Sequence, residues 1–238
     1  MATEAFFWRG RRQAREEVER LSNLVVVSGP PSCGKTSLLF QFAFNVALAF
    51  ADANVIFICN RHKLDSKPPF LSQGIEASSD VFRRIQMKYV NDDEDINKYF
   101  AAFHLFDKLP AAVVIDDFGD FFHHKMCQER YNSNPRGRDL AMVRSLALCH
   151  NAIAYANQKG SCKLVLSDTY HGDSPKLHFI YKKWIPTIFT IKGDESGSFV
   201  LKDKSNSGTN HSDSTKVAKY SIALQYLLLE RIVEVEAQ

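Results

Sequence analysis

The stretch that decides the fold is Leu24-Val-Val-Val-Ser-Gly-Pro-Pro-Ser-Cys-Gly-Lys-Thr-Ser37, or LVVVSGPPSCGKTS. Its apolar, β-branched start predicts a buried strand over Leu24–Ser28, and the glycine that follows predicts a turn. After the turn, the run SLLFQFAFNVALAF is apolar nearly all round, which predicts a core helix over Thr36–Phe50. A buried strand, a glycine turn and a core helix together make one unit of an α/β protein.

The same stretch carries the complete P-loop pattern, a glycine followed after four residues by Gly-Lys-Thr. Glycines let the backbone turn tightly and point N–H groups at phosphate oxygens, and the helix N-terminus adds partial positive charge. In such a loop the lysine bridges the β- and γ-phosphates, and the threonine hydroxyl binds magnesium. The sequence therefore predicts that ATP and Mg²⁺ are bound by Gly29, Pro30, Pro31, Ser32, Cys33, Gly34, Lys35, Thr36 and Ser37.

A second segment has the form of a Walker B strand. Val113-Val-Ile-Asp116 is apolar and ends in a carboxylate, which in P-loop proteins holds magnesium through water. Thr36 and Asp116 are thus the predicted metal site. The next residue, Asp117, is a possible base for hydrolysis, and its alternative is a solvated acid at a strand end. With Lys35 and Asp117 as the predicted catalytic residues, and aspartate shorter than the usual glutamate, we expect slow intrinsic hydrolysis.

The rest of the chain alternates between buried strands and helices. Strands are predicted at 54–59, 85–90, 111–116 and 162–167, and helices at 92–109 and 139–158. A hairpin is predicted from 185–191 and 198–202, and 217–235 could be strand or helix. We expect a mainly parallel sheet with helices on both faces and a C-terminal hairpin. Residues 1–23 are predicted to be a polar lead-in, 24–238 a single domain, and 203–215 a flexible loop.

The composition is consistent with one hydrophobic core and says little about which kinds of partner the protein binds. The chain has 238 residues, 45% of them hydrophobic, and its 30 Lys+Arg against 27 Asp+Glu give a formal charge of +3. Such a balance permits a nucleic-acid partner without requiring one. No apolar run approaches the roughly 20 residues that span a bilayer, so no membrane contact is expected.

Several segments together resemble RecA-type recombinases and their paralogues. GPPSCGKTSLLFQFAFNVAL, the Walker B strand, the basic loop KMCQERYNSNPRGRDL, the helix AMVRSLALCHNAIAYANQKG and the strand CKLVLS follow that family's order. ANVIFICNRHKLDSKPP followed by VFRRIQMKYV resembles, more narrowly, the small recombinase-like ATPases that partner a SWIM zinc-finger protein in Shu-type complexes. The resemblance runs from about residue 24 to residue 200.

This resemblance implies a RecA-like P-loop NTPase core with a role in homologous recombination repair. It implies a nuclear location and a DNA-stimulated ATPase that supports recombinase filaments on single-stranded DNA. The implied protein partners are a SWIM zinc-finger protein and a RecA-type recombinase or its paralogues. Two departures favour an accessory factor over a strand exchanger. No DNA-binding domain precedes the P-loop, and no linker of the family's polymerisation type is obvious. Cys59-Asn60-Arg61 also stands where RecA-type enzymes keep a catalytic glutamate, which agrees with slow hydrolysis.

Position in the family also indicates candidate DNA contacts. The loop after the Walker B strand corresponds to residues 123–138, which are basic and turn-rich. Flexible cations suit contacts to the phosphate backbone, and a tyrosine can stack on a base. The predicted DNA-binding residues are Lys125, Arg130, Tyr131, Arg136 and Arg138. A solvated basic loop is the alternative. A second loop, near 168–178, offers Tyr170, His171 and Lys176.

Two other functions remain open from the sequence. A nucleotide-stabilised scaffold without turnover is favoured by the missing glutamate. A small P-loop kinase acting on a metabolite would share the P-loop and the sheet, and Arg136 with Arg138 could then belong to a lid over the acceptor.

Overall fold

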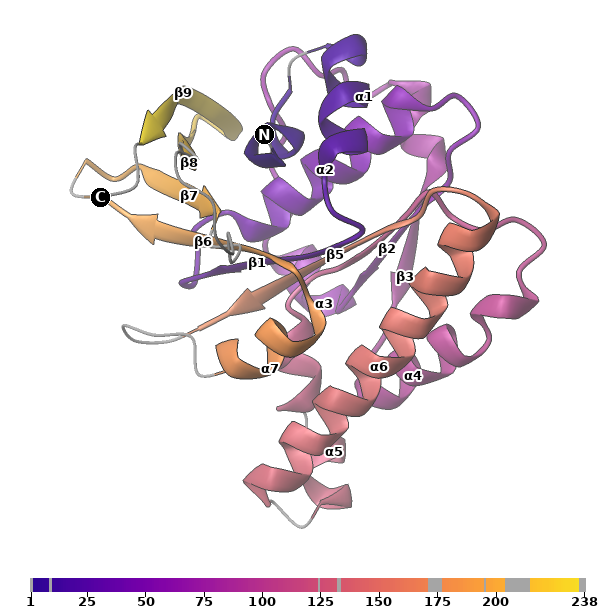
Figure 1. The fold of residues 1–238 in the computed structure, drawn as a ribbon. Coiled ribbons are helices and arrows are strands. Elements are labelled where there is room, and N and C mark those ends of the chain that lie inside the picture. Colours follow the sequence, from indigo (N-terminus) through magenta and orange to yellow (C-terminus); the bar gives the residue numbers. More distant parts are fainter. Residues whose placement is uncertain are drawn as a thin grey trace.

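A nine-stranded mixed sheet forms the centre of the molecule (Figure 1). The computed structural model describes residues 2–8, 10–123, 125–131, 134–170, 177–194, 196–203 and 215–235. The strand order is β3-β2-β4-β5-β1-β6-β7-β8-β9. The strands are β1 (Leu24–Gly29), β2 (Val55–Cys59), β3 (Ile85–Tyr89), β4 (Ala112–Ile115), β5 (Lys163–Thr169), β6 (Thr187–Gly193), β7 (Phe199–Asp203), β8 (Thr215–Ala223) and β9 (Tyr226–Val235).

The sheet is parallel from β3 through β6 and antiparallel from β6 through β9. This confirms the predicted α/β class, the mostly parallel sheet and the C-terminal hairpin. The ambiguous segment 217–235 turns out to be a hairpin, β8 with β9. Its turn residues Leu224 and Gln225 have φ of 52° and 63°, the left-handed conformation that joins two twisted strands in a two-residue turn.

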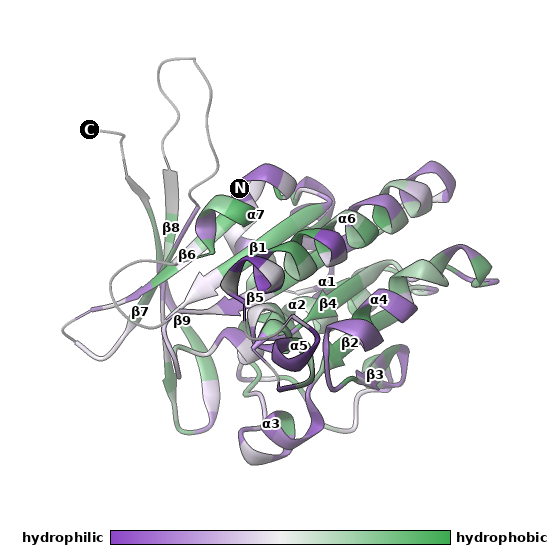
Figure 2. Ribbon diagram, turned by 90° about the horizontal axis from the view of Figure 1, so that it is seen from below, coloured by the Kyte–Doolittle hydropathy of each residue, from purple (hydrophilic) through white to green (hydrophobic). Residues whose placement is uncertain are grey.

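Helices cover both faces of the sheet (Figure 1). The helix α2 packs on one face beneath α1, and α4, α6 and α7 pack on the other, each side enclosing its own apolar core. Figure 2 shows apolar strands of the central sheet between helices that carry both apolar and hydrophilic residues. The helices are α1 (Arg11–Arg20), α2 (Lys35–Ala49), α3 (Arg61–Ser66), α4 (Asp93–Ala101), α5 (Lys125–Arg130), α6 (Pro135–Lys159) and α7 (His178–Trp184). None of them is long and apolar enough to cross a membrane.

The structure differs from the predicted polar lead-in at its first residues. A 3₁₀ turn over Ala2–Phe6 buries the Phe6 and Phe7 side chains. The Phe6 ring contacts Phe42 on α2 and Phe189 on β6, with centroids 5.7 and 5.4 Å away. The segment is therefore part of the core and covers the P-loop helix, which explains why α2 is apolar nearly all round.

Three segments differ from the predicted boundaries. The segment between the predicted strands 54–59 and 85–90 begins with α3, which Asn60 caps by accepting a hydrogen bond from the Lys63 N–H. The helix expected to reach residue 109 ends at Ala101 and is followed by a 3₁₀ turn, Phe103–Leu105. The basic loop 123–138 contains α5 and the start of α6. Most of the predicted flexible loop, 204–214, lies outside the described residues.

Candidate functional site

An open pocket of about 770 Å³ lies at the carboxyl ends of the parallel strands. Ligands of open α/β sheets bind at this edge, because the loops that leave the strands gather there. The pocket brings together the P-loop, α3 and the segment after it, the ends of β4 and β5, and side chains from β7 and β8. The residues predicted from the two motifs thus meet in one place.

The P-loop backbone adopts the tight turn that its glycines allow. Gly34 has a φ of 82°, and a Cβ there would lie 2.3 Å from the Ile222 side chain on β8. Only glycine therefore fits at this position. From the same strand, the Tyr220 hydroxyl donates to the Cys33 carbonyl over 2.7 Å. The C-terminal hairpin holds the phosphate loop in shape.

Lys35 is a nearly buried cation, only 6% exposed. Its ammonium donates to the carbonyls of Pro30 at 2.7 Å and Gly29 at 3.2 Å, and within the described chain it forms no ion pair. The ammonium also contacts the Cys33 sulfur at 3.7 Å, and its charge acts on the buried Asp116 and Asp168 without an ion pair to either. An anion beside this nearly buried cation would therefore be favoured. Burial raises the pKa of the Cys33 thiol, so the cysteine contributes packing and no charge.

Thr36 and Asp116 form the predicted magnesium pair. The Thr36 hydroxyl donates to Asp116 Oδ2 over 2.8 Å, and the Ser167 hydroxyl donates to Asp116 Oδ1 over 2.7 Å. Burial, and then the charge of Asp117, raise the pKa of Asp116, so a bound cation would relieve a disfavoured charge. The described residues hold no cluster of three metal-binding side chains. Mg²⁺ needs none, since it takes one or two protein oxygens, waters and phosphate.

Asp117, the predicted base, lies on the pocket wall with all its polar groups engaged. Its N–H donates to Ser167 Oγ at 2.8 Å, and its Oδ1 accepts from the Thr169 hydroxyl. Its Oδ2 lies 3.5 Å from the ammonium of Lys63, which also pairs with Asp120. Sequence reasoning missed Lys63 and Asp120, although Lys63 follows the end of β2 by only a few residues.

Replacing Asp168 with asparagine is expected to stabilise the protein above pH 6 and to change little near pH 4. Burial raises the pKa of Asp168 from 3.8 to about 6, against the opposing effect of the Tyr181 hydroxyl. The folded state therefore binds the proton more tightly than the unfolded state, and stability falls as the pH rises from about 4 to about 6. Asparagine carries no charge, so Asp168→Asn should gain ~3 kcal/mol at neutral pH, at about 1.4 kcal/mol for each pKa unit.

Urea unfolding at about pH 4 and about pH 7.5 measures this difference. Asp52→Asn is the control, because Asp52 is exposed in a turn. An equal effect of Asp168→Asn at both pH values would contradict the assignment.

The five predicted DNA-binding residues lie on α5, in the turn that follows it and at the start of α6, and none of them lines the P-loop pocket. Arg130 is tied to the first turn of α4 by ion pairs with Asp92, Asp93 and Glu94. Tyr131 packs against Gly137, where a Cβ would lie 2.5 Å from the tyrosine Cβ. These two side chains serve the local structure.

The other three cations of this segment are more accessible. Lys125 is exposed and pairs with Glu129, and Arg136 is exposed. Arg138 is half-buried beside the His123 ring and Asp139. In the second candidate loop, Tyr170 donates to the Ile191 carbonyl at 3.0 Å, and residues 171–176, including His171 and Lys176, lie outside the described residues.

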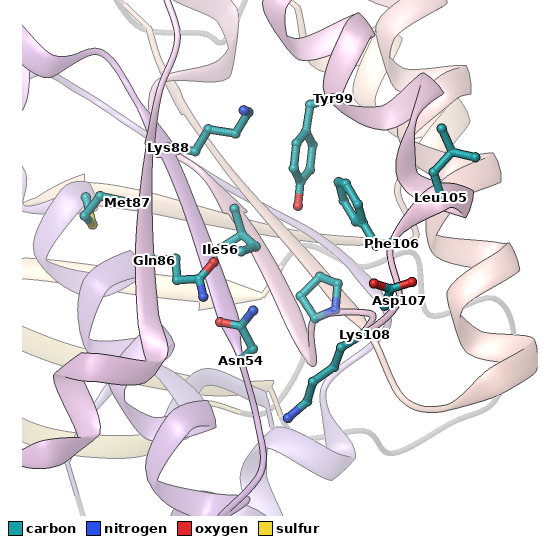
Figure 3. A pocket seen from close by; sticks show the side chains of 11 residues that line it. Asn54, Ile56, Gln86, Met87, Lys88, Tyr99, Leu105, Phe106, Asp107 and Lys108 are labelled. Carbon is teal, nitrogen blue, oxygen red and sulfur yellow. The ribbon is translucent and has the colours of Figure 1, made fainter.

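A separate pocket of about 500 Å³ lies on the α4 face of the sheet at the β3 edge (Figure 3). Its lining includes Ile56, Tyr99 and Phe106, and the Lys88 ammonium sits 5.3 Å from the centre of the Tyr99 ring. It shares no lining residue with the pocket at the P-loop. The two motifs therefore single out the P-loop pocket as the candidate site.

Comparison with known proteins assigns no family to the chain. No protein-family model matches it, and a search of curated proteins returns no match. What the pocket does must accordingly be inferred from its own residues.

Proposed function

We propose that this protein binds ATP with Mg²⁺ at Gly29–Thr36. The observation that carries the proposal is the nearly buried Lys35 ammonium, which forms no ion pair with the described residues, in the same pocket as the Thr36–Asp116 pair. The loop N–H groups and Lys35 would hold the phosphates, and Thr36 with Asp116 would hold magnesium, which neutralises phosphate charge when bound.

Apolar side chains of the pocket suit the nucleobase. Its lining includes Pro68, Phe70, Phe199 and Ile222, which offer apolar surface. The segment carrying Phe70 is fixed to the P-loop helix, because the Phe70 N–H donates to the Ser37 hydroxyl at 2.9 Å. Nucleotide sites commonly combine such apolar surface with a few polar groups that fix orientation.

We infer that hydrolysis is slow. Asn60 and Arg61 follow β2, so no carboxylate stands directly after that strand, and Asp117 is held by Thr169 and Lys63. A base already paired with a cation has little tendency to take a proton from water. The same contact favours the second candidate, a scaffold that nucleotide stabilises and that does not turn it over.

The resemblance to RecA-type paralogues supplies the proposed biological role. We propose an accessory factor of homologous recombination in the nucleus, working with a SWIM zinc-finger protein and a recombinase on single-stranded DNA. Lys125, Arg136 and Arg138 are the proposed phosphate contacts, since Arg130 and Tyr131 are engaged within the fold. The kinase alternative has less support, because the lid arginines Arg136 and Arg138 do not line the pocket.

Hydrolysis of ATP by the purified protein, with and without single-stranded DNA, tests this proposal. DNA should raise a low basal rate if the protein is a DNA-stimulated ATPase. Neutralising Lys125, Arg136 and Arg138 together should weaken DNA binding and lower the slope of log affinity against log salt by about 2, at roughly 0.7 for each lost phosphate contact.

Neutralising Lys182, Lys183 and Lys192, which lie on α7 and β6, is the matched control. Unchanged DNA affinity in the α5–α6 variant would remove the proposed DNA surface. Absence of turnover even with DNA would favour the scaffold, and phosphate transfer to a small acceptor would favour a kinase.

A further inference from the structure

Lys63 is a second cation in the P-loop pocket, on the side of the pocket where β2 ends. We propose that Lys63 binds the terminal phosphate of the nucleotide, and that it exchanges its carboxylate partners for that phosphate when a triphosphate enters. This inference rests on the proposed function and adds to it a residue that distinguishes a triphosphate from a diphosphate.

Its placement follows from strand order. β2 lies next to β4, so α3, which follows β2, stands beside the carboxylates that follow β4. The Lys63 ammonium is 3.5 Å from Asp117 Oδ2. Asp117 directly follows Asp116, whose Oδ2 accepts the hydrogen bond from the Thr36 hydroxyl. The ammonium is therefore adjacent to the predicted magnesium pair, where the last phosphate of a P-loop nucleotide lies.

Lys63 is also free to change partners, unlike Lys35. Its side chain is 51% exposed, and both Asp117 and Asp120, its present partners, contact solvent. Ion pairs exposed in this way contribute little free energy, and a lysine is a flexible point charge. A triphosphate brings several negative charges into the same pocket, so it can compete for this ammonium without disturbing the fold.

The exchange would have a consequence for Asp117. Once Lys63 turns to the phosphate, Asp117 keeps its hydrogen bond from Thr169 and loses its cation. The residue proposed as a weak base would then become available only when a triphosphate is present. Lys63 would thus link recognition of the terminal phosphate to activation of the carboxylate beside it.

Affinity for a non-hydrolysable Mg·ATP analogue and for Mg·ADP, measured by calorimetry, tests the inference. Lys63→Ala should weaken the analogue about tenfold, as expected for one lost charge-assisted contact, and change ADP less than about twofold. Lys63→Arg should restore most of the preference. Arg61→Ala is the matched control on the same helix, because Arg61 lies over the Tyr89 ring, outside the pocket.

Asp120 provides an independent test with the opposite sign. Asp120→Asn removes a competing partner of Lys63, so analogue affinity should rise, and this gain should vanish in the Lys63→Ala background. An unchanged ratio of analogue to ADP affinity in Lys63→Ala would overturn the inference, as would a gain from Asp120→Asn that persists without Lys63. If the wild-type protein bound neither nucleotide, the proposed function itself would fail. If the wild-type protein bound both nucleotides and Lys63→Ala kept the same ratio of affinities, only the role of Lys63 would fail.

Discussion

Lys35→Ala will abolish binding of Mg·ATP at concentrations that saturate the wild-type protein, with a loss of at least about 100-fold in affinity. The lysine ammonium is the only nearly buried cation among the described residues that line the P-loop pocket. Each charge-assisted hydrogen bond to phosphate contributes about 1.5–3 kcal/mol, and Lys35 would bridge two phosphates. Its loss therefore exceeds the roughly 2.7 kcal/mol that a 100-fold change requires.

The variant should remain folded, because the Lys35 ammonium bonds only groups of its own loop, two carbonyls and the Cys33 sulfur. The measurement is the ligand-induced shift in unfolding free energy, about 2.7 kcal/mol at a ligand concentration 100 times the wild-type Kd and at most about 0.4 kcal/mol for Lys35→Ala at the same concentration. Lys88→Ala, at the pocket in Figure 3, is the control and should behave as wild type. A full shift in Lys35→Ala would refute the site.

The residues of this site could be selected from the sequence because each belongs to a short local motif, the P-loop or the Walker B strand. The strand, glycine turn and helix around Gly34 follow from residues adjacent in the chain. The two motifs pair Asp116 with Thr36, and in the fold the two residues meet because the parallel strands that precede them end at the same edge of the sheet. Their 2.8 Å contact spans 80 positions of sequence, yet each residue was recognisable from its own motif.

The contacts that the sequence did not predict join segments with no pattern of their own. Arg130 reads as a free cation in a polar loop, and only the docking of α5 on the first turn of α4 shows that it is paired. Tyr220 bonds the P-loop from 187 residues away, on a strand whose apolar pattern fitted a helix equally well. The placement of Lys63 in the pocket could be predicted only by knowing that α3 forms and that it lies beside the end of β4. The proposed phosphate contacts are thus recognisable from the motif, whereas the side chains around them are placed by tertiary contacts.

Phe6→Ala is expected to destabilise the protein by about 3–5 kcal/mol, as for other fully buried phenylalanines. Phe6 is 0% exposed and bridges Phe42 on the P-loop helix and Phe189 on β6. Alanine would leave a cavity between them, and the loss would be a large part of the roughly 5–15 kcal/mol that typical domains possess. The adjacent backbone is fixed as well, because the Asn45 amide donates to the carbonyls of Ala5 and Phe7 at 2.9 Å each.

Urea unfolding measures this loss as a lower midpoint with an unchanged slope, because the surface exposed on unfolding stays nearly the same. Arg12→Ala is the matched control in the same N-terminal region, since the Arg12 side chain is 96% exposed, and it should change stability by less than about 0.5 kcal/mol. The two variants separate an N-terminal segment that is part of the core from a solvated lead-in, for which both substitutions would be nearly neutral. Phe6 packs on the helix that carries Lys35 and Thr36. An unchanged stability of Phe6→Ala would therefore contradict the conclusion that this segment supports the P-loop helix.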